Sequence, residues 1–229
     1  MDDSFGKITS GLAAQDNLVL KTIAFVRNSL PDWRDDPNRP REQSEKKLNL
    51  QLVKFLGSQA RDDFPMICFN HEEYQWGQRS VDISASPIEQ VVINATTYTI
   101  YNPFLVLECK RLPAPSKARE IEYVTGLDQK TGGIQRFKLG LHGSNLDIVV
   151  LIGYLQKDSA THWHKKINSW VSQLCSGIIK DVCNWNADEF LESFKEDPSK
   201  SISSCRSIHS RIESNSTKVE IHHLWIRMN

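Results

Sequence analysis

The sequence lacks the features that mark several common protein classes. Its 229 residues hold 28 Lys and Arg against 28 Asp and Glu, a formal net charge of zero, so no global basic field indicates a nucleic-acid binder. The five cysteines include no Cys-x-x-Cys pair, which argues against a disulfide framework and a structural zinc site. No apolar run approaches the roughly 20 residues that a membrane span needs.

Targeting signals and nucleotide-binding loops are also missing. The acidic start Met1-Asp2-Asp3 has none of the basic-then-apolar layout of a signal peptide, so we expect a cytoplasmic protein without a membrane partner. Gly132-Gly133 lacks the lysine and serine of a phosphate-binding loop, which makes nucleotide binding improbable. Hydrophobic content of 39% and charged content of 24% are typical of a globular domain.

The length predicts one domain over 1–229 rather than two independent ones. An N-terminal helix and connector would occupy 1–40, a catalytic core 41–155, and a helix and hairpin 156–229. Within the first part, apolar spacing predicts a helix over 16–30, followed by a proline-rich connector over 31–40.

Further helices are predicted from apolar spacing and bounding glycines. They cover 41–59, 116–125, 134–140 and 159–183. Glu45 lies one turn before Leu48, so it shares the inward-leaning face of the first of these helices.

Strands are predicted from alternation and from short apolar runs. They cover 65–70, 78–84, parts of 87–102, 104–111, 146–155, 203–212 and 219–228. Turns are predicted at 74–77 and at 213–217, the second of which would close an antiparallel hairpin. Together these elements predict an α/β fold, with a mixed central β-sheet flanked by helices, an N-terminal helix and a C-terminal β-hairpin.

The run Phe104–Arg111 is apolar until it ends in two charges of opposite sign. In an extended strand Glu108 and Lys110 project from the same face as Phe104 and Val106, about 7 Å apart at Cα. Cys109 faces the opposite side. A strand this hydrophobic is typical of the middle of a sheet, where charged side chains are unusual. The two charges therefore indicate a function.

A second carboxylate lies in the strand predicted over 78–84. There Val81 and Ile83 face one way and Asp82 faces the other. Acidic side chains from adjacent strands can converge on a divalent cation, and hard oxygen ligands suit Mg²⁺ or Mn²⁺. A lysine beside them can orient water or neutralise charge on phosphorus, so the set matches phosphodiester hydrolysis.

Over about 41–155 the chain resembles the PD-(D/E)XK nuclease superfamily, the restriction-endonuclease-like fold. The resemblance rests on Ser80-Val81-Asp82-Ile83, on Glu108-Cys109-Lys110 and on Glu45 of the preceding helix. Val81 stands where that family usually has a proline.

The resemblance implies roles for single residues. Asp82 and Glu108 would ligate the metal with the backbone carbonyl of Cys109, Lys110 would position or activate the attacking water, and Glu45 would support the site. Gln135 matches a glutamine that some branches carry, although Leu139 stands where those branches have a tyrosine.

The implied activity is hydrolysis of DNA phosphodiester bonds with Mg²⁺ or Mn²⁺, by an endonuclease rather than an exonuclease. Because the net charge is zero, we expect recruitment by a larger protein partner or assembly into a homo-oligomer. Two alternatives stay open: a nuclease-like interaction module without catalysis, and a nuclease that acts on RNA.

Basic residues near the predicted site in the sequence are candidates for binding the phosphate backbone. They are Arg111, Lys117, Arg136 and Lys138, with Arg119 and Lys130 nearby. A solvated helix face is the alternative interpretation of the same residues.

Overall fold

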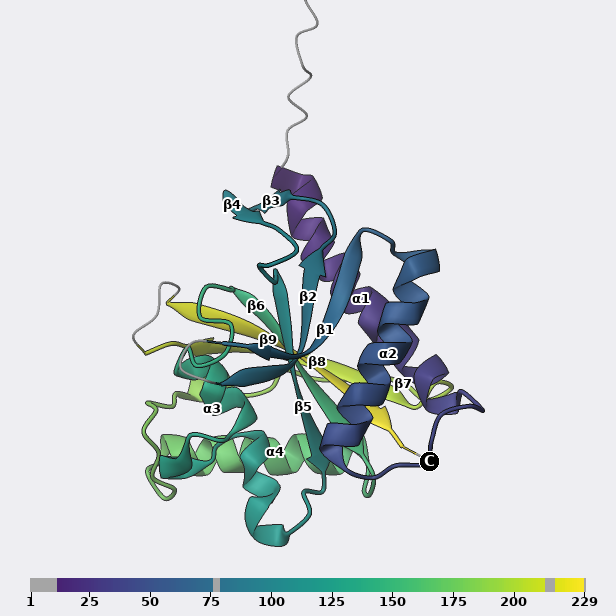
Figure 1. The fold of residues 1–229 in the computed structure, drawn as a ribbon. Helices are drawn as coiled ribbons and strands as arrows, with labels where there is room; N and C mark the ends of the chain where they lie inside the picture. Colours follow the sequence, from purple (N-terminus) through teal and green to yellow (C-terminus); the bar gives the residue numbers. More distant parts are fainter. Residues whose placement is uncertain (1–11, 76–78, 213–216, 229) are drawn as a thin grey trace, which may run out of the picture.

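A computed structural model describes residues 12–75, 79–212 and 217–228. Its centre is a seven-stranded mixed sheet in the order β1-β2-β5-β6-β9-β8-β7 (Figure 1). The strands are β1 (Ile67–Tyr74), β2 (Ser80–Pro87), β5 (Leu105–Leu112), β6 (Ile148–Leu155), β7 (Lys195–Asp197), β8 (Ile202–Ser210) and β9 (Lys218–Arg227). A separate small hairpin consists of β3 (Val91–Ile93) and β4 (Thr96–Tyr98).

The strand directions divide the sheet into three parts. β1, β2 and β5 form an antiparallel meander. β6 pairs in parallel with β5 and with β9, and β8 pairs antiparallel with β9 and with β7. The predicted mixed sheet is therefore confirmed, and β5 lies inside it between β2 and β6.

Helices cover both faces of this sheet (Figure 1). The α-helices are α1 (Leu12–Asp35), α2 (Glu45–Asp63), α3 (Gly133–Lys138) and α4 (Ala160–Cys175), and the 3-10 helices are η1 (Lys117–Tyr123), η2 (Leu127–Gln129) and η3 (Ala187–Glu189). α1 and α2 pack on one face, where Leu52 and Leu56 join Leu105 and Leu107 of β5 in the first hydrophobic cluster. α3 and α4 pack on the other face around a second cluster.

Several predicted helix ends are wrong. α1 begins at Leu12 rather than at residue 16, and α2 spans Glu45–Asp63 rather than 41–59. The C-terminal ends of α1 and α4 depart furthest from the prediction. α1 continues through Pro31 to Asp35, because Trp33 is buried in the first cluster and Arg34 donates to the carbonyl of Lys200. Packing of this last turn outweighs the hydrogen bond that proline removes. α4 ends at Cys175 rather than at residue 183, because Gly177 takes a left-handed φ of 73° that terminates a helix.

Strand faces also differ from the predictions in two places. Phe104 precedes β5 and packs in the first cluster instead of sharing the face of Val106. Val81 and Ile83 belong to opposite clusters, although one face was predicted for both. In the register between β1 and β2, Glu72 lies opposite Asp82. The φ of 53° at Glu72 distorts the ladder between the two strands at this point.

The C-terminal hairpin is confirmed as antiparallel, and it extends the central sheet because β9 pairs with β6. Of the predicted turns, residues 76–77 and 213–216 lie outside the described residues, as does the predicted strand start at 78. None of the helices in the described part is both long and apolar enough to cross a membrane.

Gly153 of β6 allows a close approach of Trp225 from β9. A Cβ added at Gly153 would lie 2.5 Å from Trp225 Cδ1 and 3.2 Å from Leu112 Cδ1. We expect Gly153→Ala to lower the free energy of unfolding by about 1–3 kcal/mol in urea titrations, because the rigid indole has to shift. Gly57→Ala in α2, where no atom lies within 4 Å of the added Cβ, should instead stabilise the protein by about 0.5–1 kcal/mol. Equal effects of the two substitutions would contradict this account.

Candidate active site

Two carboxylates replace β2 as hydrogen-bond partners of β5 where the two strands separate. The ladder between β2 and β5 stops at Leu107. Beyond it, the Cys109 N–H donates to Asp82 Oδ2 at 2.8 Å and the Arg111 N–H donates to Glu45 Oε2 at 2.8 Å. Since an unsatisfied buried N–H costs about 1–3 kcal/mol, both acids stabilise the strand end while each keeps a second oxygen for other contacts.

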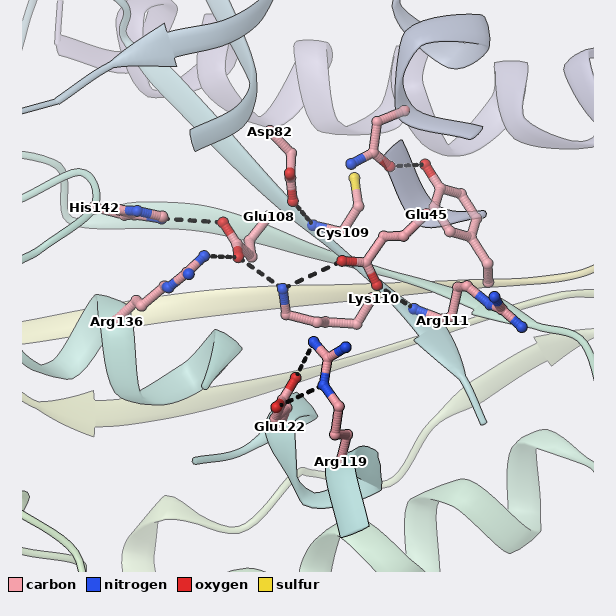
Figure 2. A network of polar contacts seen from close by, with 12 residues as sticks. Glu45, Asp82, Glu108, Cys109, Lys110, Arg111, Arg119, Glu122, Arg136 and His142 are labelled. Atoms are coloured by element: carbon pink, nitrogen blue, oxygen red, sulfur yellow. Dashed lines mark hydrogen bonds and ion pairs between the residues drawn. The ribbon is translucent and has the colours of Figure 1, made fainter. Parts of the chain in front are cut away.

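The Lys110 ammonium lies between two of the acids (Figure 2). Its Nζ is 2.9 Å from Glu108 Oε1 and 3.6 Å from Glu45 Oε1, and its side chain is 12% exposed. Burial alone would lower the pKa of Lys110, but the charges of Glu108, Glu45 and Asp82 outweigh it and raise that pKa above its usual value. Lys110 is therefore held as a cation.

Glu108 is the most enclosed member of the cluster, with 1% of its side chain exposed. Besides Lys110, Arg136 Nη1 contacts Glu108 Oε1 at 2.5 Å and His142 Nδ1 lies 3.0 Å from Oε2. Burial opposes ionisation, yet Lys110, His142 and Arg136 together lower the pKa of Glu108 well below its usual value. Glu108 is a carboxylate at neutral pH.

Asp82 has the opposite balance. Its burial and the negative charge of Glu108 raise its pKa to about 7, although Lys110 and the Cys109 N–H act against this rise. The site thus holds three acids, Glu45, Asp82 and Glu108, beside two close cations, Lys110 and Arg136. Asp82 is the buried carboxyl whose charge these two cations do not fully balance.

The donor chemistry of this cluster fits Mg²⁺ or Mn²⁺, both of which favour oxygen ligands. No group of three or more His, Cys, Asp and Glu side chains in the described ranges is arranged to hold a metal ion. Mg²⁺, however, is usually held by one or two carboxylates together with waters and substrate phosphates. Asp82 and Glu108, from neighbouring strands, supply that number.

No protein-family model, curated protein or solved structure matches this chain. The geometry of the cluster is therefore what supports a functional proposal.

Gln135 does not join the cluster to which the sequence assigned it. It is fully buried, its Nε2 donates to Leu127 O and Asp181 Oδ1, and its Oε1 accepts from the N–H groups of Gly126 and Gly132. These contacts use all four hydrogen-bonding positions of the amide. Gln135 holds the loop before α3, and its predicted catalytic role is not supported.

The structure places the four predicted phosphate-binding residues in different environments. Lys117 is exposed, whereas Arg111 Nε donates to Gln156 Oε1 at 3.0 Å and Arg136 is directed at Glu108. Exposed Arg119, near the cluster in Figure 2, forms a two-bond ion pair with Glu122. Of the four predicted residues, Arg136 and Lys138 form ion pairs with carboxylates, Arg111 contacts the neutral amide of Gln156, and Lys117 is exposed.

Lys138 cannot bind a phosphate backbone as predicted, because none of its side chain is exposed. Its Nζ contacts both Glu189 carboxylate oxygens at 2.6 Å and donates to Ser210 O at 3.2 Å. His209 Nδ1 approaches the same carboxylate at 3.4 Å. We call Lys138, Glu189 and His209 the buried charge cluster. It fixes the end of α3, two residues after Arg136.

A one-way chain of hydrogen bonds leads into the buried charge cluster. The Trp225 indole can only donate, and it donates to Tyr123 OH at 2.8 Å, so the Tyr123 hydrogen faces His223 Nδ1 at 2.8 Å. Burial lowers the pKa of His223 far below its usual value, and the neutral ring therefore carries its proton on Nε2, 2.8 Å from Ser207 Oγ. The Ser207 hydrogen then faces His209 Nε2 at 2.7 Å. Both histidine tautomers follow from this order.

His142 and the inward role of Arg136 are absent from the sequence-based predictions. Arg136 lies 28 residues and His142 34 residues further along the chain than Glu108, which both contact. No spacing rule links such positions, and the local sequence offers only a histidine between Gly140 and Gly143.

Proposed function

We propose that this protein is a metal-dependent nuclease of the PD-(D/E)XK, restriction-endonuclease-like type that hydrolyses DNA phosphodiester bonds. One observation carries the proposal. Acids from a helix and two strands, Glu45, Asp82 and Glu108, converge where Lys110 is held 2.9 Å from Glu108 and 3.6 Å from Glu45.

The order and direction of the elements support the same proposal. A helix that begins at Glu45 is followed by the antiparallel meander β1-β2-β5, by α3, and by β6 parallel to β5. The order of these elements agrees with the order on which the sequence resemblance rests for residues 41–155.

Each residue would contribute a distinct part of the chemistry. Asp82 and Glu108, with the Cys109 carbonyl, would hold Mg²⁺ or Mn²⁺, which when bound withdraws charge from the phosphate and acidifies water. The Lys110 ammonium donates hydrogen bonds to the attacking water and stabilises negative charge on the phosphate oxygens. Glu45 keeps that ammonium in place. Arg136 balances the charge of Glu108, and 25% of its side chain is exposed.

Weak binding of free DNA follows from the neutral composition and from the paired state of most nearby cations. With a net charge of zero, the chain gains little from counterion release. Recruitment by a larger protein, or assembly with further copies, would supply the missing affinity.

A cleavage assay on single- and double-stranded DNA and RNA, with and without Mg²⁺ or Mn²⁺, tests the proposed function. We expect metal-dependent cleavage of DNA, and a loss of about 10²–10³-fold in rate for Asp82→Asn. Asparagine keeps an oxygen to accept the Cys109 N–H, so the strand end should stay intact.

Asp63→Asn provides the matched control, since Asp63 is an exposed acid at the end of α2. It should cleave like the wild type. Cleavage without metal, or equal rates for the two aspartate variants, would contradict the proposal, and cleavage of RNA alone would change the substrate.

A further inference from the structure

A pocket of about 530 Å³ is lined in part by the loop that follows His142, and His142 contacts Glu108 of the candidate active site. Its walls come from the end of β1, the β3–β4 hairpin and the loop that precedes β6. We call it the amide pocket, and its lining includes Tyr74, Gln75, Thr97, Tyr98, Asn102 and Gly143.

The amide pocket is neutral but rich in hydrogen-bonding groups. None of the described residues that line it has a charged side chain, so it is unsuited to a phosphate. Asn102 lines the pocket, and its Oδ1 accepts from Thr99 Oγ1 at 2.8 Å, so the NH₂ group is the donor that this side chain can offer a ligand. Tyr74 is 79% exposed. A flat, uncharged ligand with a hydrogen-bonding edge matches these groups.

The loop that forms one wall of the pocket also contacts the candidate active site. His142 lies 3.0 Å from Glu108, and the next residue, Gly143, donates its N–H to Gln75 Oε1 at 3.1 Å. Val106, which precedes Glu108 by two residues on the same face of β5, completes this wall. The pocket and the candidate active site therefore share this loop and strand β5.

We propose that the amide pocket binds one unpaired nucleobase of the nucleic acid that is cleaved, with Tyr74 as the stacking surface and the Asn102 amide at the base edge. This inference rests on the proposed function and narrows its substrate to a strand with at least one unstacked base. A base enclosed in a pocket has to leave its duplex stack or come from a single strand.

Binding of free nucleosides tests the pocket without any need for cleavage. We expect adenosine, guanosine, cytidine or thymidine to shift the amide NMR signals of Gly143, Thr97 and Asn102, and Tyr74→Ala to weaken that binding about ten- to a hundredfold. Tyr101→Ala is the matched control, because Tyr101 is 87% exposed and does not line the pocket. It should bind like the wild type.

Cleavage of DNA that contains one abasic position provides the second readout. Loss of the base next to the cut should raise KM for the wild type, and should raise it less for Tyr74→Ala, which has already lost the stacking surface. If the protein cleaves DNA but both tyrosine variants behave like the wild type, the inference fails and the proposed function stands. Nucleoside binding at the pocket without any nuclease activity would overturn the proposed function. Methyl riboside has no base, so its binding as tightly as a nucleoside would overturn recognition of the base.

Discussion

Replacing Lys110 by methionine is expected to slow metal-dependent cleavage by about 10²–10³-fold. The Lys110 ammonium is the cation on which Glu108 and Glu45 converge, at 2.9 and 3.6 Å. Methionine fills a similar volume but offers neither a charge nor an N–H donor. Single-turnover cleavage with saturating Mn²⁺ measures the loss.

Binding of Mn²⁺ separates the role of Lys110 from that of a metal ligand. Removing a cation next to three carboxylates should strengthen Mn²⁺ binding, because less positive charge opposes the ion. Asp82→Asn should weaken the same binding, because it removes a ligand. Calorimetric titration of the two variants is therefore expected to give shifts of opposite sign while both lose activity.

Lys54→Met is the matched control, since Lys54 is an exposed lysine of α2 that lies nine residues after Glu45. Its cleavage rate should equal that of the wild type. Should Lys110→Met cleave as fast as Lys54→Met, or bind Mn²⁺ as weakly as Asp82→Asn, Lys110 would not have the role assigned to it. Urea unfolding of Lys110→Met is needed to show that the fold persists.

Two expectations about the candidate site had different origins. Alternation along one strand predicts that Glu108 and Lys110 share a face. The order of the elements, matched to the nuclease-type pattern, brought Glu45 and Asp82 to the same strand, although their contacts with β5 span 66 and 27 residues. The structure satisfies them, with direct contacts from Lys110 to Glu108 and Glu45.

Tertiary packing decided the features that could not be predicted. Lys138 has the composition of a surface residue, and only the fold shows that Glu189, which lies 51 residues later, meets its ammonium. Gln135 fitted a sequence pattern, but the loop around Gly126 and Gly132 uses its hydrogen-bonding positions. In each case the deciding partner comes from outside the segment that was interpreted.

The buried charge cluster should have a large effect on stability. Glu189→Gln leaves the Lys138 ammonium buried without a carboxylate, and Lys138→Met leaves the Glu189 carboxylate without its cation. Each substitution is expected to lower the free energy of unfolding by about 3–5 kcal/mol. The double variant should be more stable than the sum of the two losses predicts, with a coupling energy of about 2–3 kcal/mol in urea titrations.

The exposed pair Lys47–Glu42, with Nζ and Oε1 2.9 Å apart, provides the matched double-mutant cycle. Because solvent screens this pair, Lys47→Met and Glu42→Gln should couple by less than about 1 kcal/mol. The cluster also anchors α3, so Glu189→Gln should displace Arg136 from Glu108 and lower the cleavage rate, whereas the exposed cycle should not alter it. Equal coupling in the two cycles would show that Lys138 and Glu189 do not form a desolvated pair in the folded protein.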